Sequence, residues 1–321
     1  MRTNPFGALY EICNTGSNAW KYAGLAPSPR MIDIEPTDAC NFRCLMCPTG
    51  NRSLSRKAGV MDWGVFVRVA EQCAGYGTGL RFIGWGEPML CPELVAMVEY
   101  ATALGLPTHI NTNGSLMDAA MASRLIEGGL SSIKFSLQGT DRDGYAEMRN
   151  VDWFDGLRET VAMFHTMRGD RSLPYIQVST TTTRETPDQV EAFRAMFDPI
   201  CDAVSVGKTV FAHLDLTAAR MSDADRATLA KLSEYHPADL THPMPCPEVY
   251  DKLTVHWDGA VRVCCNDYDG ITDLGNVMKR PLFDIWRDVT IELLRKRLAD
   301  NDYGGPLCAT CWHYMPGAVA P

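Results

Sequence analysis

Six short apolar segments between residues 31 and 206 alternate with helix-like segments, and this alternation limits the fold more than any other feature. The segments span residues 31–35, 80–84, 107–111, 132–137, 176–181 and 203–206. Between two of them, residues 92–104 carry apolar side chains at helical spacing: Leu94, Met97, Val98, Ala101 and Leu104. Regular strand–helix alternation predicts an α/β fold with a parallel sheet, either open or closed into a barrel. In such folds the ligand site lies at the carboxyl ends of the strands.

The pattern changes near residue 240, where His242, Pro243 and Pro245 indicate a stiff linker. Apolar segments at 252–257 and 261–264 then flank Asp258-Gly259, a dipeptide typical of hairpin turns. A helix is predicted over 282–298, with these apolar side chains on one side: Ile285, Trp286, Val289, Leu293 and Leu298. We therefore expect a cap at 1–30, an α/β unit at 31–240 and a small hairpin-plus-helix domain at 241–321. Pro27 and Pro29 interrupt any helix in the cap.

Composition narrows the class of protein. Of 321 residues, 46% are hydrophobic and 21% are charged, as in globular proteins with a large core. Asp and Glu outnumber Lys and Arg by 39 to 30, and the net charge of -9 argues against a nucleic-acid partner. No apolar run reaches the roughly 18 residues of a membrane span, and no secretory signal is evident. Because the chain has 12 cysteines, we expect free thiols and metal ligands in the reducing cytoplasm.

Three cysteines follow the first predicted strand with the spacing C-x3-C-x2-C: Cys40, Cys44 and Cys47. Thiolates are soft ligands, and spacings this short let one loop wrap a metal ion or an iron–sulfur cluster. Three protein ligands on a four-iron cluster leave one iron without a protein partner. An open coordination position is typical of a catalytic metal site, whereas structural sites are closed. A structural zinc site and plain buried thiols are the alternatives for these residues.

Gly84-Trp85-Gly86-Glu87-Pro88 ends the second predicted strand, and with the cysteine spacing it resembles the radical S-adenosylmethionine (radical SAM) enzymes. The resemblance covers most of the chain and implies a partial (β/α)6 TIM-like barrel. It also implies that Cys40, Cys44 and Cys47 hold a 4Fe–4S cluster. Gly84, Gly86 and Glu87 would then hold the methionine amino group of the cofactor. Glycine allows a close backbone approach, and a carboxylate suits an ammonium group.

Three further residues match positions at which this family contacts S-adenosylmethionine. Asn113 follows the third predicted strand and Ser136 lies in the fourth, and both match contacts to the ribose or the carboxylate. By the same resemblance, Arg149 would pair with the methionine carboxylate. Turn, capping or ion-pair roles fit these residues equally well when each is taken singly.

A second set of cysteines lies near the C-terminus: Cys246, Cys264, Cys308 and Cys311. With Gly259 between the first two, their spacing resembles the twitch domain, the shorter form of the SPASM domain of radical SAM enzymes. It implies that four thiolates hold an auxiliary 4Fe–4S cluster. A zinc ribbon is the alternative, because four thiolates suit zinc equally well. Cys265 directly follows Cys264, so we expect it to point away from this cluster, as a hydrogen-atom donor to a substrate radical or as a packed thiol.

The resemblance implies that the reduced first cluster cleaves S-adenosylmethionine and that a 5′-deoxyadenosyl radical takes hydrogen from the substrate. An auxiliary cluster that accepts the second electron favours oxidation of a secondary alcohol to a ketone. The expected substrate is a carbohydrate-like intermediate of antibiotic biosynthesis, such as an aminocyclitol, sugar or nucleoside. Alternatives are redox-neutral epimerisation with Cys265 as hydrogen donor, diol dehydration, sulfur insertion from the auxiliary cluster, peptide maturation, and non-catalytic electron transfer.

The expected partners are a small-molecule substrate and a protein electron donor such as flavodoxin or ferredoxin, with no nucleic acid and no membrane. Candidate substrate-binding residues lie on or near the fifth and sixth predicted strands: Tyr175, Gln177, Thr181, Arg184, Lys208 and His213.

Overall fold

The computed structural model describes residues 2–14, 25–209, 211, 218–234, 246, 248–300, 302, 304, 305, 307 and 308. Within them, nine strands form one sheet in the order β6-β5-β4-β3-β2-β1-β7-β8-β9. Neighbours among the first six strands pair in parallel: β1 (Met31–Ile34), β2 (Gly79–Phe82), β3 (Thr108–Thr112), β4 (Ser132–Ser136), β5 (Tyr175–Thr182) and β6 (Ala203–Lys208). The predicted parallel α/β architecture is therefore confirmed, with each strand beside its predecessor as in a TIM-like barrel.

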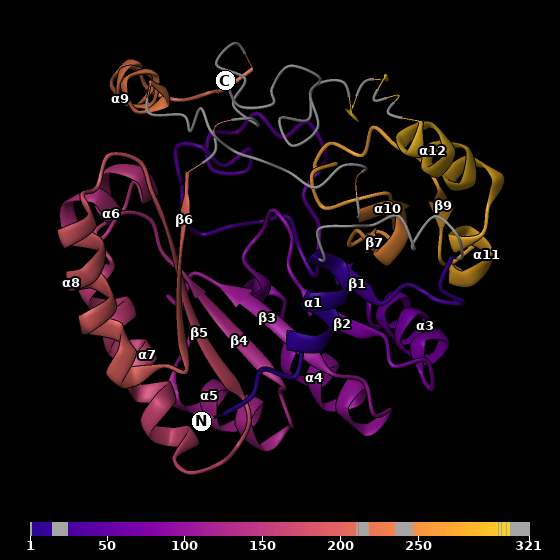
Figure 1. Cartoon of the computed structure of the whole chain (residues 1–321), viewed down its shortest axis with the longest axis horizontal. Helices are drawn as coiled ribbons and strands as arrows, with labels where there is room; N and C mark the ends of the chain where they lie inside the picture. The colour runs from indigo at the N-terminus through magenta and orange to yellow at the C-terminus, as the bar shows by residue number, and fades with distance from the viewer. Residues whose placement is uncertain are drawn as a thin grey trace.

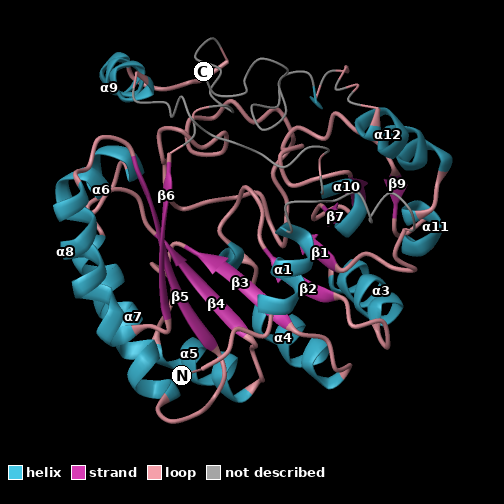
Figure 2. Cartoon of the chain, viewed as in Figure 1, coloured by secondary structure: helices cyan, strands magenta, loops and turns pink. Residues whose placement is uncertain are grey.

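Helices follow the strands and cover the outer face of the curved sheet (Figures 1 and 2). They are α3 (Trp63–Cys73), α4 (Leu94–Ala103), α5 (Ala119–Glu127), α6 (Arg142–Arg149), α7 (Phe154–Arg168) and α8 (Pro187–Phe197), with short 3-10 turns η1 (Pro88–Leu90) and η2 (Asp198–Ile200). Side chains cap the beginnings of several helices, as Asp62 does for α3, Asp118 for α5 and Asp141 for α6. Each such cap stabilises its helix by about 0.5–2 kcal/mol.

The two faces of the barrel strands differ in chemistry. Ile32, Ile133 and Phe135 are fully buried in the core that the strands share with the outer helices. Residues of the opposite parity, such as Asp33 and Lys134, face the inside of the barrel, because side chains alternate along a strand. Parallel strands are usually apolar on both faces. A polar lumen therefore indicates space for a ligand rather than a second core.

A short N-terminal helix, α1 (Gly7–Asn14), precedes the barrel. Pro27 and Pro29 were expected to interrupt any helix in the cap, and α1 ends well before them. Phe6, just before α1, is fully buried against Met31 and stacks near His109 at 5.5 Å between ring centroids. A Cβ at Gly79 would lie 2.6 Å from the Phe6 ring, so this glycine admits the aromatic side chain at the amino end of β2.

The C-terminal hairpin extends the barrel sheet. β7 (Lys252–Val255) pairs in parallel with β1, and β8 (Ala260–Arg262) and β9 (Gly275–Asn276) continue antiparallel from it. The predicted turn at Asp258-Gly259 joins β7 to β8, and Gly259 has a φ of 81°, which favours glycine. The hairpin was predicted as part of a separate small domain, but its strands share one sheet with the barrel. Residues 235–245 lie outside the described residues, so the boundary at residue 240 stays a prediction.

The prediction of a single helix over residues 282–298 is wrong. Two helices occupy this stretch, α11 (Leu282–Trp286) and α12 (Val289–Ala299), because Asp288 adopts an extended conformation and caps α12. The break rotates the second helix, so Val289 and Leu293 are 67% and 57% exposed instead of buried. α10 (Glu248–Asp251) and α9 (Asp223–Ser233) complete the described helices. None of the described helices combines the length and apolar character needed to cross a bilayer.

Candidate active site

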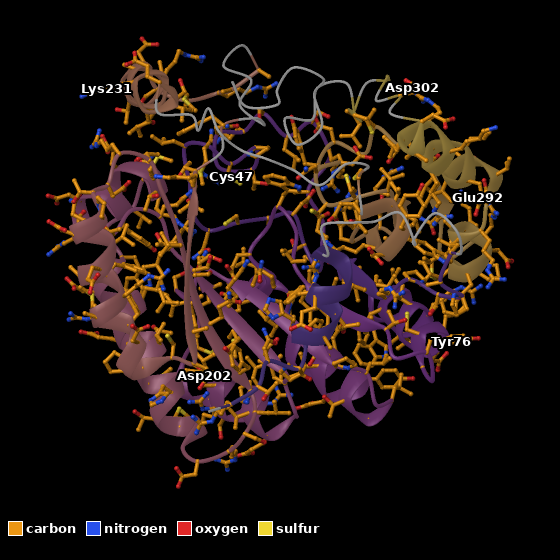
Figure 3. All side chains as sticks on the ribbon, in the orientation of Figure 1. Cys47, Tyr76, Asp202, Lys231, Glu292 and Asp302 are labelled. Carbon is orange, nitrogen blue, oxygen red and sulfur yellow. The ribbon has the colours of Figure 1, made fainter. Side chains whose placement is uncertain are left out.

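A cavity of about 340 Å³ opens at the carboxyl ends of β1 to β4. Every residue predicted for the first cluster and its cofactor lines this cavity: Cys40, Cys44, Cys47, Gly84, Gly86, Glu87, Asn113, Ser136 and Arg149. Figure 3 shows Cys47 in the upper part of the molecule, far from Asp202, which precedes β6 at the amino edge. The cavity is of the size that binds small molecules, roughly 300–1,000 Å³.

The cysteine loop folds back on itself, which brings its thiols together. The Cys47 amide donates to the Cys44 carbonyl at 3.2 Å, and the Asn51 amide donates to the Cys47 carbonyl at 2.8 Å. Burial, with a smaller contribution from the nearby Cys44 thiol, raises the pKa of Cys40 to about 12 and that of Cys47 to about 11. All three cysteines line this one cavity. Cluster binding must displace their protons.

Glu87 is 3% exposed and is held by three hydrogen bonds. Its Oε1 accepts from the Thr112 hydroxyl at 2.7 Å and from the Met89 amide at 3.1 Å, while Oε2 accepts from the Asn113 amide at 2.8 Å. Burial raises the pKa of the carboxyl group, and these hydrogen bonds oppose the rise. The carboxylate is therefore oriented before any ligand arrives, and it suits a cationic ligand group. Sequence reasoning missed Thr112, although it lies within the strand-end segment 111–114.

The two glycines before Glu87 have a structural role that the sequence did not reveal. A Cβ at Gly86 would lie 2.2 Å from the Thr37 carbonyl oxygen, and one at Gly84 would lie 2.6 Å from the Glu35 side chain. We expected these glycines to let the backbone approach the cofactor closely. In the structure they first of all admit residues 35–39, which lead from β1 into the cysteine loop.

The remaining predicted residues form the opposite wall. The Arg149 guanidinium donates to the Ser136 carbonyl at 2.6 Å, and the Asn113 amide group donates to Asn41 at 2.9 Å. Two buried wall atoms, Arg149 Nε and Gln138 Oε1, have no hydrogen-bond partner among the described residues. A buried polar atom without a partner costs roughly 1–3 kcal/mol, and water or a polar ligand in the cavity would satisfy both atoms. S-adenosylmethionine fits this wall because its carboxylate can accept from Arg149 Nε and its ribose hydroxyl groups can donate to Gln138 Oε1.

A second cavity of about 260 Å³ lies beside the first. Three of the four cysteines predicted for the auxiliary cluster line it, namely Cys246, Cys264 and Cys308, whereas Cys311 lies outside the described residues. Burial and the nearby Cys265 and Cys246 raise the pKa of Cys264 well above its usual value. Cys265 lines the same cavity as Cys264. Burial raises its pKa to about 12, and charges of Glu248 and Asp33 add to the effect, so its thiol stays protonated.

The two cavities adjoin. Ile83 lines both, and Trp85 of the first cavity donates from its indole Nε1 to the Cys265 carbonyl at 2.7 Å. The Trp85 ring also packs edge-on against Tyr268, with 5.4 Å between centroids. One side chain therefore fixes the distance between the glycine–glutamate segment and the second cysteine set.

Charged residues from neighbouring strands meet in the lumen below this junction. Arg81 makes a bidentate ion pair with Asp33 at 2.6 and 2.7 Å, and Lys252 pairs with Glu248 at 2.5 Å. Lys134 makes no hydrogen bond or ion pair with the described residues. Burial and, second, the charge of Arg81 lower its pKa to about 8, and Cys265 and Asp33 oppose the change. In register it lies between Asn111, which lines the first cavity, and Gln177.

Sequence reasoning missed Lys134. The available signal was its position between Ile133 and Phe135 in β4, since alternation along a strand directs it to the lumen. Five of the substrate residues that sequence reasoning named line neither cavity: Tyr175, Gln177, Thr181, Arg184 and Lys208. Gln177 hydrogen-bonds with Ser205, and Arg184 pairs with Glu147 at 2.7 Å. Lys208 is exposed, and His213 lies outside the described residues.

Comparisons with known proteins agree with this geometry. The profile of the radical SAM superfamily matches residues 34–195, which is half of the chain and includes the whole first cavity. The chain belongs to the radical SAM superfamily. A second profile, an iron-sulfur cluster-binding domain of the SPASM type, matches residues 246–312. This radical SAM enzyme therefore uses S-adenosylmethionine and a 4Fe–4S cluster, with further iron–sulfur binding in its C-terminal region.

Individual relatives are distant. The AdoMet-dependent heme synthase of Methanosarcina barkeri is 24% identical over 163 residues, which are 51% of this chain and 45% of that protein. The chain thus spans less than half of the length of this relative. Among solved structures, BtrN in complex with AdoMet and 2-DOIA has a TM-score of 0.54 at 19% identity, covering 88% of this chain and 92% of BtrN. Streptococcus suis SuiB bound to precursor peptide SuiA has a TM-score of 0.64 at 16% identity, covering 85% of this chain and 68% of SuiB. These likenesses concern the fold.

Proposed function

We propose that this radical SAM enzyme oxidises a secondary alcohol of a small carbohydrate-like molecule to a ketone. The observation that carries the proposal is the contact of the two cysteine-lined cavities at Ile83 and at the Trp85–Cys265 hydrogen bond. A substrate at this junction lies within reach of both sites. BtrN, which has a similar fold over nearly its whole length, was solved with AdoMet and 2-DOIA, so the fold accommodates a small molecule beside the cofactor.

In the first cavity we assign Cys40, Cys44 and Cys47 to a 4Fe–4S cluster with one open iron. Glu87 would hold the methionine ammonium, and Arg149 the methionine carboxylate through its free Nε. Asn113 and Ser136 would contact the ribose, and Gly84 and Gly86 shape the wall beside them. When bound, the reduced cluster and S-adenosylmethionine supply a 5′-deoxyadenosyl radical.

In the second cavity we assign Cys246, Cys264, Cys308 and Cys311 to an auxiliary 4Fe–4S cluster. The substrate carbon would give a hydrogen atom to the radical, its hydroxyl group would give a proton to a base, and the remaining electron would pass to the auxiliary cluster. Lys134, which lies in the lumen below the junction and lines neither cavity, is the proposed base and would receive the proton through a water molecule. It has no partner in the described part of the chain, and with a pKa of about 8 it is partly neutral near neutral pH.

The reaction is tested by anaerobic turnover of aminocyclitols, sugars, nucleosides and peptides that carry deuterium at the carbon to be oxidised. We expect one deoxyadenosine for each ketone formed, with the deuterium transferred into deoxyadenosine. A product at the same oxidation level as the substrate excludes the alcohol oxidation.

A second candidate function is redox-neutral epimerisation, which the position of Cys265 favours. Its thiol lines the cavity at the junction and stays protonated, as a hydrogen-atom donor must. Replacement of Cys265 by Ala separates the two functions. Epimerisation should stop, whereas ketone formation should continue at a similar rate.

The setting of the enzyme is also a proposal. A protein electron donor such as flavodoxin or ferredoxin would reduce the first cluster, and the many free thiols favour the cytoplasm. We keep the division into a cap at 1–30, a barrel at 31–240 and a cluster domain at 241–321, with the qualification that β7 joins the barrel sheet.

A further inference from the structure

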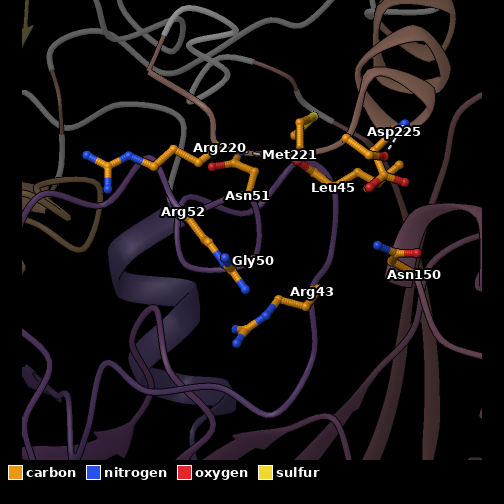
Figure 4. A pocket seen from close by; sticks show the side chains of 10 residues that line it. Arg43, Leu45, Gly50, Asn51, Arg52, Asn150, Arg220, Met221 and Asp225 are labelled. Carbon is orange, nitrogen blue, oxygen red and sulfur yellow. Dashed lines mark hydrogen bonds between the residues drawn. The ribbon is translucent and has the colours of Figure 1, made fainter.

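A pocket of about 250 Å³ lies on the outer side of the cysteine loop and belongs to neither cavity described above. Figure 4 shows it from close by, between the cysteine loop and the beginning of α9. Three arginines line it, namely Arg43, Arg52 and Arg220, together with Leu45, Asn51 and Asp225.

Only one thickness of backbone separates this pocket from the first cluster site. Along the loop, Arg43 and Leu45 line the outer pocket, whereas Cys44 and Met46 line the inner cavity. Gly50 also lines the outer pocket, and a Cβ there would lie 2.2 Å from the Cys44 carbonyl oxygen. Glycine therefore lets the pocket floor lie directly on the backbone of a cluster cysteine.

Hydrogen bonds continue this path to the cysteines. The Arg220 amide donates to the Asn51 carbonyl at 2.8 Å, and the Asn51 amide donates to the Cys47 carbonyl at 2.8 Å. The Asn51 side chain donates to the Leu45 carbonyl at 3.1 Å. A molecule seated on Arg220 and Asn51 would thus be connected to two cluster ligands by a few covalent and hydrogen bonds.

The charge of the pocket is opposite to that of the chain as a whole. The net charge of the chain is -9, yet the pocket combines three exposed arginines with one acidic residue, Asp225. Within the described part of the chain, none of the three guanidinium groups has a hydrogen bond or ion pair. Figure 4 shows the Arg43 and Arg52 side chains pointing toward one another, although like charges repel. An anionic partner between them would remove this repulsion.

The pocket is also a place where the backbone is held in a strained form. Arg52 has a φ of 61° and Asn150 has a φ of 55°, and both residues line the pocket. They are the non-glycine residues with positive φ among the described ones. Asn150 is the left-handed C-cap of α6, an ordinary place for asparagine, so of the two only Arg52 carries a strain of roughly 1–3 kcal/mol.

We propose that this arginine pocket is the docking site of an acidic electron-transfer protein that reduces the first cluster. The step moves one electron from the reduced cofactor of the donor to the cluster, and no bond forms or breaks. Electron-transfer encounters use small interfaces that are steered by opposite charges. A protein carrier is too large for the inner cavity of about 340 Å³, and at the cysteine loop one strand of backbone separates the arginine pocket from the cluster cysteines. The inference rests on the proposed protein electron donor and not on the proposed alcohol oxidation.

The test compares two reductants in substrate-free cleavage of S-adenosylmethionine, measured as deoxyadenosine. One is flavodoxin kept reduced by its NADPH-dependent reductase, and the other is dithionite, which needs no docking site. The variant Arg52→Glu/Arg220→Glu should raise the KM for flavodoxin about tenfold or more and leave the dithionite-driven rate within about twofold. The matched control, Arg124→Glu/Arg142→Glu, reverses two other exposed arginines and should change neither rate. The pair Arg52→Lys/Arg220→Lys keeps the charge and should retain most of the flavodoxin-driven rate.

An unchanged KM for flavodoxin in the Glu variant would overturn the proposal. So would an equal loss of the dithionite-driven rate, because the arginines would then act on the cluster itself. The wild-type enzyme provides a check that needs no folded variant. Raising the salt concentration should slow the flavodoxin-driven reaction severalfold and leave the dithionite-driven one unchanged, and equal salt effects would again contradict docking.

Discussion

The indole Nε1 of Trp85 donates a 2.7 Å hydrogen bond to the backbone carbonyl of Cys265. Trp85 lies in the glycine–glutamate segment of the first cavity, and Cys265 lines the second. This contact joins residues 180 positions apart and sets the separation between the proposed radical site and the proposed electron acceptor. Coupling of the two half-reactions should depend on it.

Replacement of Trp85 by Phe removes this hydrogen bond and keeps an aromatic ring against Tyr268. We expect stability to fall by about 1 kcal/mol and deoxyadenosine to form in excess over ketone, because the substrate radical is then oxidised less efficiently. The ratio of deoxyadenosine to ketone measures the effect. Trp153→Phe is the matched control, since the Trp153 indole nitrogen has no hydrogen-bond partner among the described residues. An unchanged ratio in Trp85→Phe would show that the contact is only structural.

Replacement of Glu87 by Gln should weaken S-adenosylmethionine binding about tenfold to a hundredfold. The charged acceptor of the methionine ammonium is lost, and the Gln amide group must face the Thr112 hydroxyl or the Asn113 amide. Calorimetry on the reconstituted enzyme measures the affinity. Iron content should stay normal, and Glu99→Gln, an exposed change on α4, should have no effect. Normal affinity in Glu87→Gln would remove this residue from the cofactor site.

Iron content should separate the two cysteine sets. If each holds a 4Fe–4S cluster, the reconstituted enzyme contains about eight irons, and Cys40→Ala/Cys44→Ala/Cys47→Ala or Cys246→Ala/Cys264→Ala leaves about four. Cys265→Ala should keep all of them, because Cys265 is assigned as a hydrogen donor and not as a ligand. Iron, sulfide and zinc assays measure how many clusters the enzyme holds and whether either cysteine set binds zinc instead. About four irons and one zinc in the wild-type enzyme would contradict the auxiliary cluster.

Lys134 should make stability depend on pH. Its pKa of about 8 in the folded state is lower than the roughly 10.4 of an unfolded lysine, so between these values the unfolded chain binds more protons. Stability therefore rises with pH in this window, and the full cost, on the order of 3 kcal/mol, applies below pH 8. We expect Lys134→Met to be more stable than wild type at pH 7, with a smaller difference at pH 10, and to lose ketone formation.

Denaturant unfolding at both pH values measures this difference. The exposed Lys279→Met serves as control and should show none. Equal stability of Lys134→Met and wild type at pH 7 would mean that the ammonium group is well solvated in the lumen.

The sequence predicted much of the site because it depends on local order. Strand–helix alternation brings all carboxyl ends to one edge, so residues directly after strands, such as Cys40, Glu87 and Asn113, must converge there. The sequence predicted helix boundaries less well where a helix ends inside a continuous apolar pattern. Asp288 starts a new helix inside an apolar pattern that continues across it, and the pattern alone gave one helix instead of two.

By itself, the sequence determined the superfamily, the parallel barrel and the two cysteine sets, because spacing and periodicity are properties of neighbouring residues. Only the tertiary structure decided which residues meet across the lumen. It left Lys134 without a partner in the described part of the chain while Arg81 pairs with Asp33, and it joined Trp85 to Cys265. It also gave Gly86 a role against the Thr37 backbone. These relationships depend on strand register and on the pairing of β7 with β1, which no local pattern specifies.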